Sequence, residues 1–153
     1  MANPAFHASL VSFIDTSSVE EVETLMSSML CDQGFVEPSF KDALLERETN
    51  FPTALSLGTY GVAIPHTEGE HTKQGAIALG ILKNPVTWKR MDDPDESCPV
   101  RLVIMLALQD PHDHLEMLQR VISLVQNHDL INQVLEQSDA QRVADLVTPT
   151  LLG

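Results

Sequence analysis

The chain has 153 residues, with 9 Lys and Arg against 22 Asp and Glu, so its formal net charge is −13 with neutral histidines. Nucleic acid and anionic lipid both attract a positive surface, so this charge argues against a protein that binds either through its general field. Hydrophobic residues make up 43% of the chain and charged residues 20%, which is typical of a globular fold. We predict a single domain spanning 1–153.

Two helices are predicted in the N-terminal third. Ser17 or Ser18 can cap the first, which carries apolar residues at three- and four-residue steps and stops at Gly34. A second helix is predicted from about Pro38, and the residues expected on its outward face are Lys41, Asp42 and Glu48. Residues 49–57 have no clean period and are predicted to form a loop.

Short apolar runs follow and predict strands. Residues 61–65 read as a strand stopped by proline, which cannot donate to a sheet ladder. Residues 76–82 and 99–108 are apolar and bounded by polar or turn residues, so both are predicted to be buried strands, with a shorter one at 86–88. The acidic segment 91–97 is predicted to be a solvated loop.

Helical spacing returns at His114, and the predicted apolar stripe of this helix comprises Leu115, Leu118, Val121, Ile122 and Val125. Two more helices are predicted, at 129–137 and from Ser138 onward. Helices that flank a run of strands indicate one α/β sandwich, with the helices covering a small sheet.

The cysteines and the hydropathy pattern indicate the compartment. Cys31 and Cys98 show no metal-finger or CxxC spacing, and residues 1–14 contain no Lys or Arg and therefore no secretory leader signal. The longest uninterrupted apolar stretch, 102–108, is far shorter than the roughly 20 residues that cross a bilayer. We expect a cytoplasmic protein with reduced thiols and no direct membrane insertion.

Histidines are the candidates for chemistry, because no P-loop, dinucleotide-binding, serine-hydrolase or HExxH motif is present. His66 and His71 follow a predicted strand together with Glu68, in a position typical of functional loops. His112 and His114 lie between a predicted strand and a predicted helix, where a helix N-terminus favours an anion. A surface loop and a helix cap remain the plain alternatives for these two segments.

Two uses of these histidines are open. A zinc site could take ligands from His66, His71, Glu68 and His112 or His114, although their spacing matches no metal signature. Alternatively, a neutral imidazole can attack phosphorus and carry the phosphoryl group, provided that cations or N–H groups hold its oxygens. Arg47 is a candidate cation, and its plain alternative is a solvated helix residue.

Several segments in order resemble the enzyme IIA of the fructose/mannitol class of the bacterial sugar phosphotransferase system. They cover residues 11–147 and comprise ALLERE at 43–48, FPTAL at 51–55, GVAIPH at 61–66, PVRLVIMLAL at 99–108 and His114-Leu115. Residues 64–68 with His71 and Lys73, and 88–95 leading into 98–100, are most similar to the galactitol-type branch.

This resemblance implies an α/β single-domain sandwich, with a mixed sheet of about five strands and helices on both sides. It implies that His66 accepts a phosphoryl group from phospho-HPr through Nε2 and passes it to a cysteine of enzyme IIB, which serves a membrane enzyme IIC. Arg47 would steady the phosphoryl oxygens and His114 would hydrogen-bond them, with no cofactor or metal. From their proximity in sequence, Glu68 and His71 are expected to orient His66 or tune its pKa.

Some alternatives stay open. A regulatory enzyme IIA of the nitrogen type would use the same His66 but act through partner binding. The zinc hypothesis remains the less favoured competitor. The negative charge fits either the steering of basic partners or plain solubility, and the acidic loop 92–96 has no assigned role.

Overall fold

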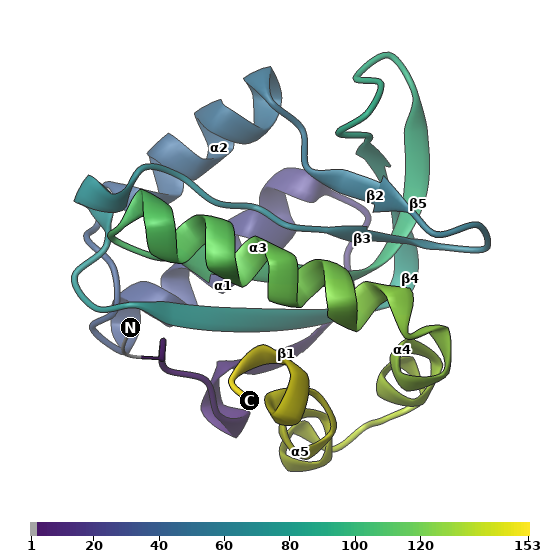
Figure 1. The fold of residues 1–153 in the computed structure, drawn as a ribbon. Helices are drawn as coiled ribbons and strands as arrows, with labels where there is room; N and C mark the ends of the chain where they lie inside the picture. The colour runs from purple at the N-terminus through teal and green to yellow at the C-terminus, as the bar shows by residue number, and fades with distance from the viewer. Residues whose placement is uncertain (1–2) are drawn as a thin grey trace.

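The computed structural model describes residues 3–153, built around one five-stranded mixed sheet of order β1-β4-β5-β3-β2 (Figure 1). The central strands β4 (Ala76–Lys89) and β5 (Ser97–Ala107) are antiparallel. β1 (Val11–Ile14) runs parallel to β4 and β3 (Gly61–Ala63) parallel to β5, while β2 (Ala54–Ser56) forms the other edge, antiparallel to β3. The mixed sheet confirms the predicted α/β fold.

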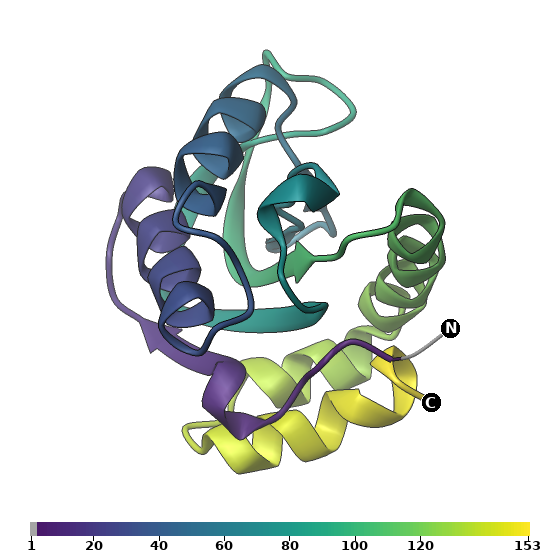
Figure 2. The same cartoon turned by 90° about the vertical axis from the view of Figure 1, so that its left-hand side faces the viewer.

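Helices cover both faces of this sheet (Figure 2). On one side lie α1 (Val19–Asp32) and α2 (Phe40–Asn50), and on the other α3 (Pro111–Gln126), α4 (His128–Leu135) and α5 (Ala140–Leu151). Two short 3-10 helices, η1 at Ala8–Leu10 and η2 at Gly69–His71, complete the elements. Among residues 3–153, no helix is long and apolar enough to span a membrane.

The central strands form the core of the sandwich. All of residues 76–82 in β4 and 102–107 in β5 are buried, on alternating faces of the sheet. A strand covered on both faces reads as a continuous apolar run, which explains why these two strands were predictable. Residues 86–88, predicted as a separate strand, instead continue β4 after a register irregularity between Ile81 and Val86.

The prediction of a loop over 49–57 was wrong, because α2 continues to Asn50 and residues 54–56 form β2. A three-residue edge strand is too short to show an alternating pattern. Helix α5 begins at Ala140 after Asp139, whose side chain accepts a hydrogen bond from the N–H of Gln141, so Asp139 rather than Ser138 caps it.

Two predicted helix faces were also partly wrong. Glu48 was expected on the outside of α2 but is buried, with an exposed fraction of 8%. In α3, Leu115 and Ile122 were expected inside but are exposed, and the buried residues are Met117, Val121, Leu124 and Val125. The α3 sequence contains overlapping apolar stripes at helical spacing, and only packing against the rest of the fold selects one of them.

Candidate active site

His66 lies on backbone that is fixed to the centre of the sheet. Beyond the end of β3, the carbonyl of Pro65 accepts a hydrogen bond from the N–H of Leu106 in β5 at 3.0 Å, and His66 forms a parallel bridge with Leu106. Pro65 itself is buried, while the His66 ring is half-buried. The imidazole is therefore presented from a rigid strand end rather than from a loose surface loop.

A cavity of about 230 Å³ adjoins the His66 ring. Its walls come from three places far apart in the sequence: Arg47 on α2, residues 66–69 after β3, and residues 108–111 together with His114 where β5 leads into α3. The fold thus brings Arg47, His66 and His114 to one pocket.

The tautomer of His66 follows from its hydrogen bond. Nδ1 lies 2.8 Å from the carbonyl oxygen of Ile64, which can only accept, so Nδ1 carries the proton and Nε2 keeps its lone pair. Burial lowers the pKa of His66, and the nearby charge of Arg47 lowers it further, against the opposing effect of the Ile64 bond. The ring is therefore favoured as a neutral imidazole with a nucleophilic Nε2.

His114 faces His66 directly, with ring centroids 4.3 Å apart and planes inclined by 46°. Burial lowers the pKa of His114 to about 4, and the charges of His66 and Arg47 contribute in the same direction. No described residue hydrogen-bonds its buried Nε2. This nitrogen is free to bind a group that enters the pocket.

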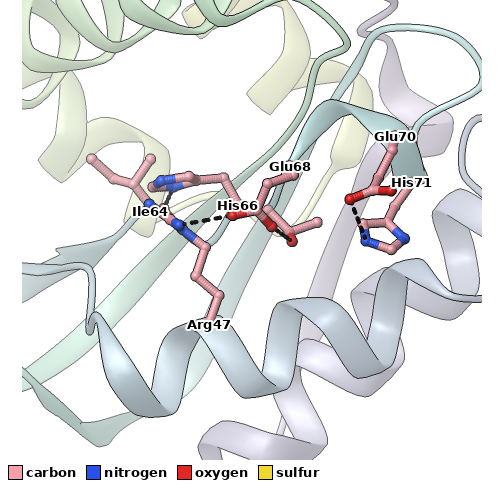
Figure 3. A network of polar contacts seen from close by, with 7 residues as sticks. Arg47, Ile64, His66, Glu68, Glu70 and His71 are labelled. Atoms are coloured by element: carbon pink, nitrogen blue, oxygen red, sulfur yellow. Dashed lines mark hydrogen bonds and ion pairs between the residues drawn. The ribbon is translucent and has the colours of Figure 1, made fainter.

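Arg47 supplies the positive charge of the site. Its Nη1 donates to Oε1 of Glu68 at 3.2 Å, and the guanidinium lies 5.4 Å from the centroid of the Phe51 ring. Figure 3 shows the side chain extending from α2 toward His66 and Glu68. Its buried Nε has no hydrogen-bond partner among the described residues. Arg47 is thus held in place with donor capacity remaining.

Glu68 and His71 are not placed against the His66 ring. Glu68 pairs with Arg47, accepts the Thr67 hydroxyl at 3.0 Å and lines the pocket. Its negative charge raises the pKa of His66, against the larger lowering effect of burial. His71 Nδ1 lies 2.8 Å from the Ser39 hydroxyl and its Nε2 lies 3.9 Å from Glu70. In Figure 3 the pair of Glu70 and His71 lies apart from His66.

The histidines do not form a metal centre. His112 is exposed, and its backbone N–H donates to the side chain of Asp110 at 2.8 Å. Within residues 3–153, no group of three or more His, Cys, Asp or Glu side chains is arranged to hold a metal ion. The zinc hypothesis therefore has no ligand set in this part of the chain.

Sequence reasoning missed two residues that shape the pocket. Asp110 caps α3 immediately before Pro111, and a capping residue followed by proline at the first helical position was a readable signal. Gly69 packs on the backbone of Gln109 so closely that a Cβ there would lie 2.0 Å from its carbonyl oxygen. No local pattern announces that approach, because the two residues are 40 positions apart.

The chain is similar to known proteins in sequence and in fold. Residues 5–149 match the family described as phosphoenolpyruvate-dependent sugar phosphotransferase system, EIIA 2. The galactitol-specific EIIA component of Escherichia coli K12 is 33% identical over 136 residues, covering 89% of this chain and 88% of that protein. The mannitol-specific enzyme IIA component of Halalkalibacterium halodurans is 29% identical, covering 84% and 83% of the two chains.

Solved structures share the fold. The crystal structure of mannitol enzyme IIA from Escherichia coli superposes with a TM-score of 0.76 at 21% identity, covering 94% of this chain and 99% of the other. The complex of that enzyme IIA with phosphorylated enzyme IIB from the same organism gives a TM-score of 0.76 at 20% identity. The match covers 96% of this chain and 96% of the matched chain.

Proposed function

The chain belongs to the EIIA 2 family of the phosphoenolpyruvate-dependent sugar phosphotransferase system, and we propose that His66 is the residue on which it carries the phosphoryl group. Enzyme IIA components are phosphotransferases that hold phosphohistidine and pass the group to enzyme IIB. The observation that carries the assignment is the bond between Nδ1 of His66 and the Ile64 carbonyl, since it leaves Nε2 as the nucleophile beside Arg47 and His114.

Acceptance from phospho-HPr needs no proton transfer. The lone pair of His66 Nε2 attacks phosphorus, the new N–P bond forms, and the donor nitrogen leaves with the electron pair of the old one. The His66 ring becomes positively charged, and its Nδ1–H then makes a charge-assisted bond to the Ile64 carbonyl, which strengthens the existing contact. The same bond therefore selects the nucleophile and stabilises the product.

The other two residues act on the phosphoryl oxygens. Arg47 offers its remaining N–H donors and its charge to oxygens that are most negative in the transition state. His114, neutral because burial holds its pKa near 4, can donate from Nε2 to an oxygen without placing a second cation against the His66 ring. Delivery reverses the first step: a cysteine thiolate of enzyme IIB attacks phosphorus, and the electron pair returns to Nε2.

The pathway is proposed from the relatives. The similarity to the galactitol-specific EIIA component supports a role in galactitol or alditol uptake with a membrane enzyme IIC. The presence of two free cysteines supports a cytoplasmic location. There the chain, acting as a single domain, would receive the phosphoryl group from phospho-HPr.

The test is incubation with enzyme I, HPr and labelled phosphoenolpyruvate, followed by peptide mapping. We expect acid-labile label on the peptide that contains His66, and none in the His66→Ala variant. Absence of label in the wild-type chain, while HPr is labelled normally, would contradict the proposal. Label that moves to the enzyme IIB of a galactitol system supports uptake, whereas label that no enzyme IIB accepts favours the regulatory alternative.

A further inference from the structure

Glu48 follows Arg47 on α2 but lies on the buried side of the helix, away from the phosphoryl pocket. Both oxygens of its carboxyl accept hydrogen bonds from one residue: the N–H of Thr53 donates to Oε2 at 2.7 Å and the Thr53 hydroxyl donates to Oε1 at 2.8 Å. The bond from the Thr53 hydroxyl to Glu48 fixes the direction of the hydroxyl hydrogen, and the bond from the Thr53 N–H holds the two residues together. The lone pairs of that hydroxyl then point away from Glu48.

The Thr53 hydroxyl accepts the N–H of Ile64 at 3.1 Å. Ile64 follows the end of β3, whose last residue, Ala63, is paired with Ala54 in β2. The side chain of Thr53 thus takes the place of the next ladder partner. Since the carbonyl of the same residue, Ile64, binds Nδ1 of His66, a chain of contacts runs from Glu48 through Thr53 and Ile64 to the His66 ring.

All three supporting residues are buried, with exposed fractions of 8% for Glu48, 3% for Thr53 and 1% for Ile64. In such surroundings water does not readily replace a lost partner, and a backbone N–H left unpaired is costly. The backbone is also held on its other side, where Pro65 bonds to Leu106 of β5. Ile64 therefore has little freedom as long as Thr53 binds it.

We propose that Glu48 and Thr53 are positioning residues for phosphoryl transfer, which hold the Ile64 backbone so that its carbonyl keeps the His66 proton on Nδ1 and Nε2 faces the pocket. This inference rests on the proposed role of His66. Glu48 and Thr53 touch neither donor nor phosphoryl group, and they act only through Ile64.

A second buried carboxyl explains how Glu48 keeps its charge. Burial and the adjacent charge of Glu48 raise the pKa of Glu23 to about 9, so Glu23 is the protonated member of the pair. Burial raises the pKa of Glu48 as well, and the hydrogen bonds from Thr53 oppose this rise without cancelling it. One negative charge thus remains on the oxygens that bind Thr53.

The first test needs no variant. The ¹⁵N chemical shifts of the His66 ring in the wild-type chain report which nitrogen carries the proton. We expect the Nδ1–H tautomer to dominate at pH 7.5 and the phosphorylated product to be the Nε2 isomer. A dominant Nε2–H tautomer would overturn the inference, whatever the variants do.

The second test compares Thr53→Val, which removes the hydroxyl at nearly constant shape, with Thr53→Ser, which retains it. We expect Thr53→Val to raise the Nε2–H tautomer fraction and to slow phosphorylation about tenfold, and Thr53→Ser to stay near wild type. The matched control is Thr49→Val on α2, because the Thr49 hydroxyl bonds only the Leu45 carbonyl. Glu48→Gln should be intermediate, since its amide oxygen can accept only one of the two bonds.

The outcomes separate the inference from the proposed function. If the wild-type chain does not accept label on His66, the proposed function fails. If it does, and a folded Thr53→Val variant keeps the wild-type tautomer and rate, the positioning role fails while the phosphocarrier role stands. A Thr53→Val variant that does not fold leaves the decision to Thr53→Ser, Glu48→Gln and the wild-type spectrum.

Discussion

The two sides of α2 hold buried ionisable groups of opposite kind, and the same physical cause acts on both. On the side of Arg47, burial keeps the imidazoles of His66 and His114 neutral. On the side of Glu48, burial keeps Glu23 protonated. Desolvation disfavours whichever form is charged, so these three groups stay neutral. The charges that remain are the cation of Arg47, which is paired with Glu68, and the anion of Glu48.

The two charges have different surroundings. Arg47 borders the pocket of His66 and has donors left for an incoming group. Glu48 borders a different cavity, beside Glu23 and Trp88, and both of its oxygens already accept bonds from Thr53. A charge with unused hydrogen-bond donors beside a pocket suits an incoming group, whereas a charge whose two oxygens both bind a neighbouring residue suits structural support.

Replacement of His66 by alanine should have the largest effect. We expect His66→Ala to abolish phosphoryl acceptance completely, because the bond from Nδ1 to the Ile64 carbonyl makes His66 Nε2 the ring nitrogen whose lone pair is fixed by the fold beside Arg47. The thermal midpoint should stay close to wild type because the ring is only half-buried. His128→Ala, at the exposed start of α4, is the control, and a His66→Ala chain that still labels would remove His66 from the role.

Removal of the cation should come next. Arg47→Ala is expected to slow phosphorylation about 100-fold, the usual scale for losing one donor aimed at developing negative charge. Rapid-quench measurement with excess phospho-HPr gives the rate. Arg142→Ala, on the exposed face of α5, should leave it unchanged. Equal rates in the two variants would make Arg47 an ordinary helix residue.

His114→Ala should have a smaller effect, about tenfold on the same rate, since a neutral donor contributes less than a charged one. The exposed neighbour His112→Ala is the control and should match wild type. Loss as complete as that in His66→Ala would contradict this ranking and indicate that His114 itself takes part in bonding to phosphorus.

The smallest effects concern stability against pH, where the two sides of α2 have opposite signs. The pKa of His114 falls from an ordinary 6.5 to about 4 on folding, so the unfolded chain binds more protons in that range and acid destabilises the fold. The pKa of Glu23 rises from 4.5 to about 9, so the folded chain binds more protons there, and stability falls as pH rises through that window.

Glu23→Gln isolates the carboxyl contribution. Above about pH 7 the histidine contribution is constant, so melting curves between about pH 7 and pH 9 should show a falling midpoint for the wild-type chain and a flatter profile for Glu23→Gln. Glu21→Gln, exposed on the same helix, should keep the wild-type slope. Parallel profiles for wild type and Glu23→Gln would mean that Glu23 ionises freely in the fold.

The sequence predicts the parts of this molecule that depend on local pattern. The continuous apolar runs give β4 and β5, and the ordered segments around Arg47 and His66 give the candidate site. The family resemblance also placed His114 at the site, but no local pattern shows that its ring faces His66, because the whole β4–β5 hairpin lies between them in the sequence. Glu48 was misplaced because a carboxylate in a helix is usually exposed, and Thr53 was missed because its partners are chosen by tertiary packing.

The described ends of the chain are tied together. The Asn3 side chain donates to the carbonyl of Leu152 at 3.1 Å, and Arg120 reaches both Asn3 and the carbonyl of Leu151. Because the two described ends lie close together, the domain is suited to insertion into a loop of another protein, whose two loop ends would need to span only a short gap. The same adjacency favours circular permutation, with new ends placed in the exposed acidic turn between β4 and β5.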